Sequence, residues 1–108
     1  MMKKWDLYGF KKIGLEDARI SIEKALGLSM ESHESLYRCG NYYRFGNDGE
    51  ENFILQKNFD PFDNEWLEVE GQGLEVILYV NETSRAQEIE SLLTERIPEI
   101  TLLRREVL

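Results

Sequence analysis

Two amphipathic helical patterns, one toward each end of the chain, constrain the fold of this 108-residue protein more than any other feature. In Leu15–Leu26, apolar residues recur at the 3.6-residue spacing of one helix face, and Gly27 follows as a typical helix C-cap. Ser84–Ile97 shows the same periodicity, and Ser84 with Gln87 matches the capping-box pattern of a helix start. Each helix needs a second layer against which to bury its apolar stripe. The stripes comprise Leu15, Ala18, Ile22, Ala25 and Leu26 in the first helix and Ala86, Ile89, Leu92, Leu93 and Ile97 in the second.

The segments around these helices are rich in aromatic and β-branched residues, which favour strands. Glu75–Val80 (EVILYV) is the most apolar run, which predicts a central strand buried on both faces. Leu28–Ser35 is polar and is interpreted as a connection. Phe59–Trp66 contains Pro61, which excludes one continuous strand or helix, and Asp63-Asn64 favours a turn. The other predicted strands are Lys3–Phe10, Leu36–Cys39, Asn41–Phe45, Glu51–Asn58 and Ile100–Leu108. Leu36–Cys39 and Asn41–Phe45 are either two short strands or one strand bent at Gly40.

The order of elements predicts one α+β domain over residues 1–108, a length typical of a single domain. The order is β-α-β-β-β-β-α-β, with hairpins between two βα crossovers. We expect a two-layer sandwich: a mostly antiparallel sheet with both helices on one face, a variant of the ferredoxin-like split βαβ plan. A sheet with one helix on each face is the alternative.

The charge and cysteine content exclude several classes of partner. With a net charge of −8 and a pI near 4.7, the chain would be repelled by nucleic-acid phosphates and by anionic membranes. Cys39 is the only cysteine, so no intrachain disulfide can form and a reducing compartment is expected. The N-terminus lacks the apolar run of a signal peptide, and no apolar stretch is long enough to span a membrane. We therefore expect a cytoplasmic protein that binds neither nucleic acid directly nor a membrane.

The acidic residues are concentrated in one segment, residues 46–75. This segment holds nine acidic residues and a single base, Lys57, so it carries a charge of −8, equal to that of the whole chain. Large apolar rings are interleaved with these acids, which is the composition of a surface that receives a basic partner. The predicted partner-binding residues are Asp48, Glu50, Glu51, Asp60, Phe62, Asp63, Glu65, Trp66, Glu68 and Glu70.

Candidate catalytic and metal-binding groups are incomplete. One histidine, His33, and one cysteine, Cys39, fall short of the ligand number that a zinc site requires. Asp60 and Asp63 resemble the start of a calcium loop, but Pro61 and Phe62 interrupt the pattern. Paired acids such as Glu68 and Glu70 could perform acid–base chemistry only within an apolar cleft, which the sequence does not indicate. We therefore expect no enzymatic activity, no cofactor, and no catalytic or metal-binding residue.

The block Tyr42–Asn58 (YYRFGNDGEENFILQKN), continued by FDPFDNEW, resembles the small acidic immunity proteins of bacterial contact-dependent growth inhibition and other polymorphic toxin systems. The resemblance also covers size, acidity and the βα pattern. It implies that the chain binds and neutralises a cognate toxin C-terminal domain, commonly a basic nuclease, as a monomer or weak homodimer. Two alternatives remain open: a small homodimerising adaptor or structural domain, and a metal-dependent enzyme that uses the acidic loop.

Overall fold

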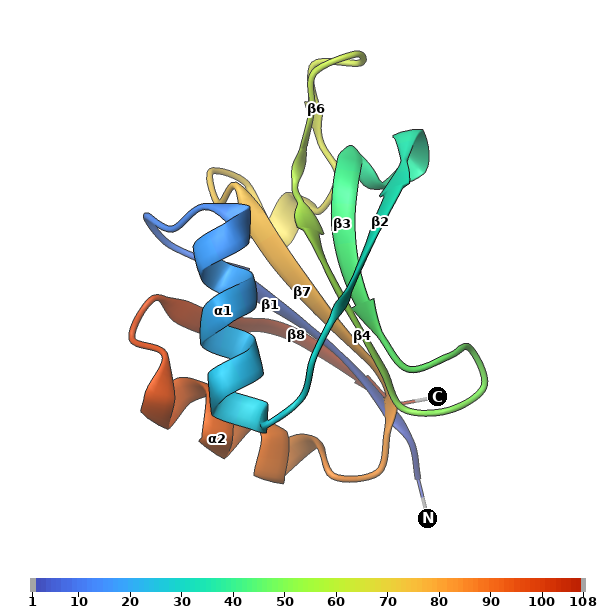
Figure 1. The fold of residues 1–108 in the computed structure, drawn as a ribbon, viewed down its shortest axis with the longest axis vertical. Coiled ribbons are helices and arrows are strands. Elements are labelled where there is room, and N and C mark those ends of the chain that lie inside the picture. Colours follow the sequence, from blue (N-terminus) through green and yellow to red (C-terminus); the bar gives the residue numbers. More distant parts are fainter. Residues whose placement is uncertain (1, 108) are drawn as a thin grey trace.

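The computed structural model describes residues 2–107, which form two helices, one large sheet and a small projecting hairpin (Figure 1). Two short 3₁₀ turns, η1 and η2, connect strands. In chain order the elements are β1 (Lys4–Phe10), α1 (Leu15–Leu26), β2 (Glu31–Ser35), η1 (Leu36–Arg38), β3 (Gly40–Phe45), β4 (Asn52–Lys57), β5 (Phe59–Asp60), β6 (Glu65–Trp66), η2 (Val69–Gly71), β7 (Val76–Thr83), α2 (Ala86–Arg96) and β8 (Ile100–Val107).

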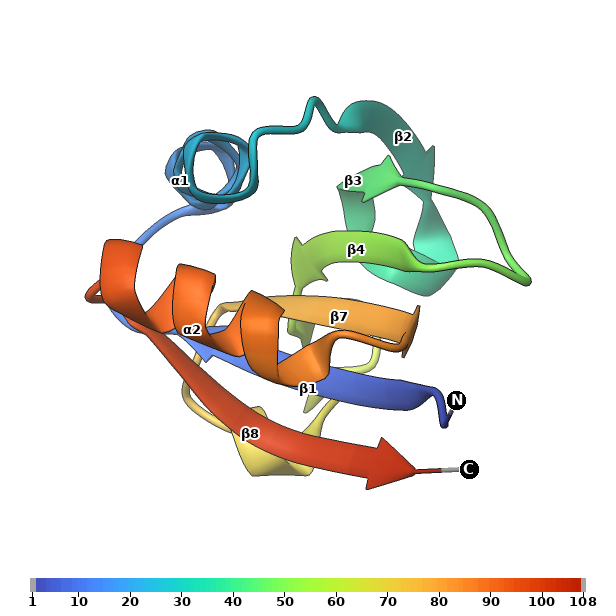
Figure 2. The same ribbon diagram turned by 90° about the horizontal axis from the view of Figure 1, so that it is seen from below.

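The large sheet is antiparallel throughout, with the strand order β2-β3-β4-β7-β1-β8. β7, α2 and β8 form a split βαβ unit with β1 between the two strands, and the four strands β4-β7-β1-β8 follow the ferredoxin-like plan. The additional strands β2 and β3 extend the sheet at the β4 edge. Both helices pack together on one face of the sheet (Figure 2). The predicted α+β fold is confirmed, and the alternative with one helix on each face is wrong.

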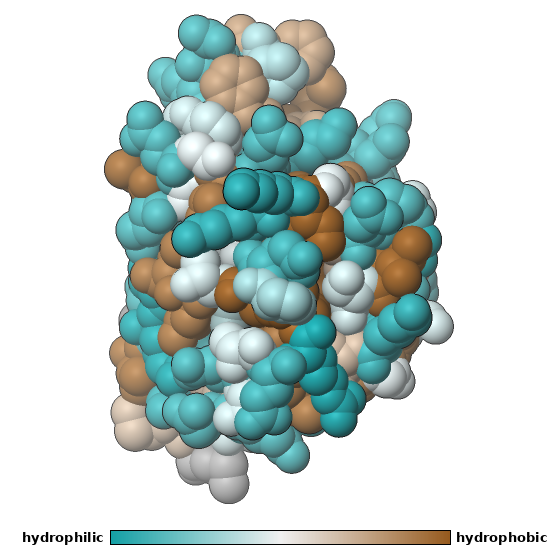
Figure 3. Space-filling view, turned by 90° about the vertical axis from the view of Figure 1, so that its left-hand side faces the viewer, coloured by the Kyte–Doolittle hydropathy of each residue, from teal (hydrophilic) through white to brown (hydrophobic). Residues whose placement is uncertain are grey.

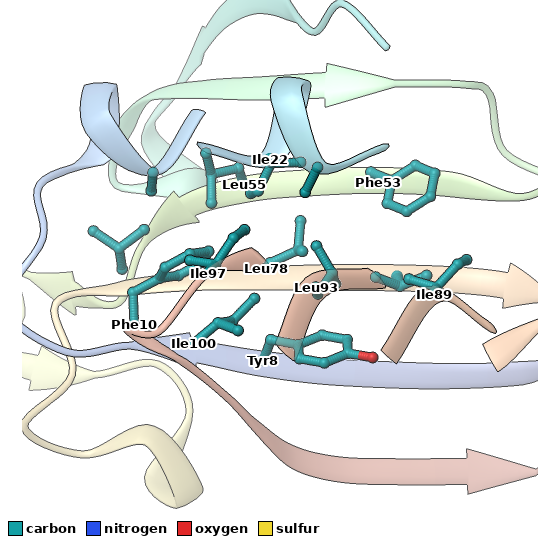
Figure 4. Close-up of a cluster of buried hydrophobic side chains, with 14 of the residues drawn as sticks. Tyr8, Phe10, Ile22, Phe53, Leu55, Leu78, Ile89, Leu93, Ile97 and Ile100 are labelled. Carbon is teal, nitrogen blue, oxygen red and sulfur yellow. The ribbon is translucent and has the colours of Figure 1, made fainter. Parts of the chain in front are cut away.

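The core lies between the two helices and the sheet (Figure 4). Alternate residues of the central strands point toward the helices, as a period of two requires. The fully buried large side chains of this layer are Tyr8, Phe10, Phe53, Leu55 and Leu78 from the sheet and Ile22, Ile89, Leu93 and Ile97 from the helix layer. The predicted central position of β7 is confirmed, since it pairs with β4 on one side and β1 on the other.

Leu93→Ala is expected to lower the free energy of unfolding by about 3 kcal/mol, because Leu93 is fully buried and its truncation leaves a cavity. Urea unfolding at pH 7 measures the change. Leu92→Ala is the matched control: the neighbouring Leu92 is only half-buried, so its replacement should lower the free energy of unfolding by less. A loss below about 0.5 kcal/mol for Leu93→Ala would show that this face of α2 does not pack as described.

Three predictions about local structure are wrong. The polar connection expected at Leu28–Ser35 contains β2, whose side chains are exposed along Glu31–Glu34 and whose order comes from backbone pairing with β3. A strand expected at Leu36–Cys39 is the 3₁₀ turn η1, with Cys39 in the left-handed region at φ 62°. The capping box at Ser84 is absent, because α2 begins two residues later and Thr83 Oγ1 accepts the backbone N–H of Arg85 instead. The predicted strand end at Leu108 lies outside the described residues.

Residues 58–75 leave the end of β4, project as the β5–β6 hairpin, and return across the helix-free face of the sheet. The buried side chain of Asn58 holds this segment of the chain together. Its Nδ2 donates to the carbonyl oxygens of Gly71 at 3.0 Å and Leu74 at 3.2 Å, and more weakly to that of Glu68 at 3.4 Å. Its Oδ1 accepts the backbone N–H of Glu68 at 2.9 Å. Gly71 packs so closely that an added Cβ would meet Leu103 at 3.1 Å.

Candidate functional site

The ten predicted partner-binding residues do not form one continuous surface. Asp48, Glu50 and Glu51 lie at the β3–β4 turn, whereas the residues of the β5–β6 hairpin lie beyond the opposite end of β4. A strand of six residues separates these two groups by about 20 Å. Figure 1 shows the hairpin at the top of the molecule and the β3–β4 turn at the lower right. Glu68 and Glu70 form a third group, on the helix-free face, so the expectation of one shared surface is corrected.

At the β3–β4 turn, the acids are engaged within the protein. Asp48 pairs with Arg44 at 2.6 Å. Glu51 accepts hydrogen bonds from Arg85 at 2.8 Å and from Thr83 Oγ1 at 2.7 Å. Glu50 accepts the backbone N–H of Asn47. These contacts tie the turn to neighbouring elements. Asp48 and Glu51 are paired with arginines, whereas Glu50 forms no ion pair among residues 2–107.

The hydrogen bond from Arg85 lowers the pKa of Glu51 below its usual value. A lowered folded-state pKa stabilises the protein above the unfolded pKa of about 4.3, and this contribution is lost as the pH falls through the folded-state pKa. We expect Glu51→Gln to cost less than about 1 kcal/mol at pH 7, since the pair is partly exposed, and to cost less at pH 3 than at pH 7. Urea unfolding at both pH values measures this difference. Glu50→Gln is the control, and an equal pH dependence in both variants would contradict the assignment.

Glu68 and Glu70 anchor the returning chain to the helix-free face of the sheet. Glu68 accepts hydrogen bonds from the Tyr79 hydroxyl at 2.5 Å and from Arg104 at 3.1 Å. Arg104 also donates to Glu70 at 3.0 Å. Burial, followed by the hydrogen bond to Glu68, raises the pKa of Tyr79, so the phenol stays protonated and remains a donor. These two acids therefore anchor the returning chain, and because they share a single arginine the group keeps a net negative charge.

The β5–β6 hairpin presents the remaining predicted residues at the end of the molecule. Asp60 Oδ1 accepts the backbone N–H of Phe62 at 2.9 Å and that of Asp63 at 3.4 Å, so the carboxylate organises the turn around Pro61. The turn predicted at Asp63-Asn64 is confirmed, with Asn64 at φ 55°.

The hairpin carries both free charge and an exposed ring. Among residues 2–107, Asp60, Asp63 and Glu65 form no ion pair. Phe62 is exposed, and hydrophobic residues are visible among hydrophilic ones at this upper end of the molecule in Figure 3. Trp66 is half-buried and packs edge-on against Phe59, with 5.1 Å between ring centroids, so it supports the hairpin more than it faces solvent.

The η1 turn stands beside the hairpin and contributes residues that sequence reasoning missed. Leu36 and Tyr37 are exposed, and Ser35 Oγ accepts the backbone N–H of Tyr37 at 3.2 Å. A groove of about 480 Å³ separates the two projections. It is lined by Leu36, Tyr37, Asp60, Phe62, Asp63 and Leu67. One local signal was available: Ser35 precedes two large apolar residues, Leu36 and Tyr37. A strand in a two-layer fold would bury only one of these two neighbours, and a serine side chain can bond to the backbone of a turn instead.

The candidate catalytic residues are not brought together. His33 stacks on Tyr42 in β3 with 5.4 Å between ring centroids and is exposed. Cys39 lines a different hollow, on the side of the hairpin that carries Phe59 and Trp66. Burial raises the pKa of the Cys39 thiol, which disfavours the nucleophilic thiolate. Within the described part of the chain, His, Cys, Asp and Glu side chains form no group of three suited to one metal ion.

No model of a protein family matches this chain, and a search of curated proteins also found no match. Over residues 2–107, neither helix has the length and apolar character needed to cross a membrane.

Proposed function

We propose that this chain is an immunity protein that binds and neutralises a cognate bacterial toxin domain, a basic nuclease, in the cytoplasm. One observation carries the proposal: among residues 2–107, Asp60, Asp63 and Glu65 have no ion-pair partner and lie on a projecting hairpin around the exposed ring of Phe62. The other acids of the segment that are held by arginine, Asp48, Glu51, Glu68 and Glu70, contribute less to a partner surface.

Physical chemistry connects this hairpin with a nuclease. A nuclease binds phosphates and therefore presents a basic surface, to which free carboxylates on a projection are attracted at long range. Such charges mainly increase the association rate and the specificity of a complex. An exposed aromatic residue such as Phe62 supplies buried area once the complex has formed and slows dissociation. The hairpin combines both properties, so it is the part of the surface that we assign to the toxin.

The first test is whether a gene beside this one encodes a toxin domain, and the second uses that domain in purified form. We expect the purified protein to bind that domain and block its nuclease activity. The triple variant Asp60→Asn, Asp63→Asn, Glu65→Gln should bind about tenfold more weakly at low salt, chiefly through slower association. The difference should shrink above about 0.1 M salt, where exposed charges are screened. The asparagine at position 60 keeps the oxygen that accepts the N–H groups of the turn.

A second triple variant, Asp48→Asn, Glu50→Gln, Glu82→Gln, removes the same charge at the other end of the molecule and is the matched control. Both variants should retain the wild-type circular dichroism spectrum. Equal weakening by the two variants would show that net charge alone matters. Unchanged affinity of the hairpin variant at low salt would exclude the hairpin as the contact, and a wild-type protein that leaves the nuclease active would reject the immunity function.

A further inference from the structure

We infer that the groove between η1 and the β5–β6 hairpin is a two-walled docking site for a protein segment that presents an apolar side chain flanked by arginine or lysine. This inference rests on the proposed function and adds two things to it: η1 as a second wall of the site, and the chemistry of the partner segment.

Apolar exposure is unusually concentrated at this groove. Four of its six lining residues are large and apolar: Leu36 is 76% exposed, Tyr37 95%, Phe62 82% and Leu67 40%. Single exposed apolar side chains are ordinary on a protein surface, but a cluster around a hollow marks a place where another molecule binds. Tyr37 and Phe62 are aromatic residues of limited rotational freedom, which suits them to anchor an interface.

The two walls and the base of the groove are held in place before any partner binds. Asp60 fixes the backbone below Phe62, and Ser35 Oγ fixes that of Tyr37. The backbone N–H of Leu67 donates to the carbonyl oxygen of the buried Asn58 at 2.8 Å. A binding site whose backbone is already ordered loses less conformational entropy when the complex forms.

The charge of the groove selects one kind of occupant. Its polar lining residues are Asp60 and Asp63, and it has no basic lining residue within the described chain. Arg38, the base closest in sequence, donates to Gln56 Oε1 at 2.8 Å and does not line the groove. Lys57 lines the separate hollow that Cys39, Phe59 and Trp66 share. A second copy of this chain would bring carboxylates against carboxylates, and nucleic acid would be repelled in the same way. A basic, partly apolar protein segment satisfies both the rings and the carboxylates.

The probe for this inference is a phage-displayed library of random 12-residue peptides, selected on the wild-type protein without any toxin. We expect the selected peptides to share an aromatic or aliphatic residue next to arginine or lysine. Fluorescence anisotropy of a selected peptide should show at least tenfold weaker binding to Tyr37→Ser and to Phe62→Ser. Val69→Ser, which removes an apolar side chain that is exposed outside the groove, is the control and should bind as the wild type does.

Several results would overturn the inference. These are a library that yields no binder, peptides without basic residues, and peptides whose binding ignores both Tyr37→Ser and Phe62→Ser. Self-association in sedimentation that is lost in Tyr37→Ser would identify a second copy as the occupant and reject the basic segment. Because the selection does not use the toxin, peptide binding without toxin neutralisation rejects the proposed function alone. Toxin binding that persists in the Tyr37→Ser variant would reject η1 as a wall of the site but would leave the proposed function standing.

Discussion

Asn58→Ala is expected to lower the free energy of unfolding by about 3–5 kcal/mol, a large effect for a polar residue. The reason is that Asn58 is fully buried and its amide serves backbone groups of three residues, Glu68, Gly71 and Leu74. Removing the side chain leaves these groups unsatisfied in a site from which water is largely excluded, and each orphaned group costs free energy. The segment that carries the hairpin would lose its attachment to the sheet.

Urea unfolding at pH 7 measures this loss, and amide hydrogen exchange over residues 67–74 locates it, because these amides should exchange faster in the variant. Asn58→Asp is expected to be at least as costly, since a carboxylate oxygen would replace the amide NH₂ group that donates to the carbonyl oxygens of Gly71 and Leu74. Asn41→Ala, at an exposed position of β3, is the control and should change stability by less than about 0.5 kcal/mol. A stable Asn58→Asp variant would contradict this role.

Arg105→Ala is expected to cost a similar amount, about 3–5 kcal/mol, because it leaves a buried carboxylate without its charge partner. The side chain of Asp6 has no exposed surface, and Arg105 donates to both of its oxygens, at 2.9 and 2.8 Å. Arg105 also pairs with Glu90 at 2.9 Å, so one side chain connects β1, β8 and α2. These carboxylates, Asp6 most of all, raise the pKa of Arg105, so the guanidinium remains charged at pH 7.

A double-mutant cycle separates the pair from its surroundings. The double variant Asp6→Leu, Arg105→Leu should lose less free energy of unfolding than the sum of the losses in the single variants Asp6→Leu and Arg105→Leu. The reason is that replacing both charges avoids an unpaired buried charge. Arg104→Ala is the matched control: Arg104 is adjacent on the same strand, but its ion pairs are partly exposed, so about 1 kcal/mol or less is expected. Additive single and double variants would show that Asp6 and Arg105 act independently.

The elements that sequence reasoning located well are those whose side-chain pattern reports burial directly. The predicted helix Leu15–Leu26 matches α1, and β7 lies at the predicted centre of the sheet, because both have an apolar periodicity that a local segment displays by itself. β2 was missed for the opposite reason. Its side chains are exposed, so the strand exists only through backbone bonds to β3, which leave no mark on the local pattern.

The candidate site was predicted only in part. The acidic segment and its aromatic residues were visible in the composition, and five of the predicted residues do lie together on the β5–β6 hairpin. Leu36 and Tyr37 could not be placed beside them, because η1 precedes β3 in the chain and meets the hairpin only through the pairing of β3 with β4. The groove exists because the sheet order places β3, and with it η1, beside β4 and the hairpin that follows β4.

The fold class and the total charge could be predicted from the residues alone, because amphipathic periods and ionisable side chains are local properties of the chain. Which carboxylates remain free depends on contacts between distant parts of the chain. Glu51 meets Arg85 across 34 positions of sequence and Glu68 meets Arg104 across 36, and such pairs form only when the sheet brings distant strands together. Asp60, Asp63 and Glu65 escape pairing because their hairpin projects beyond the sheet, away from the strands that supply these arginines.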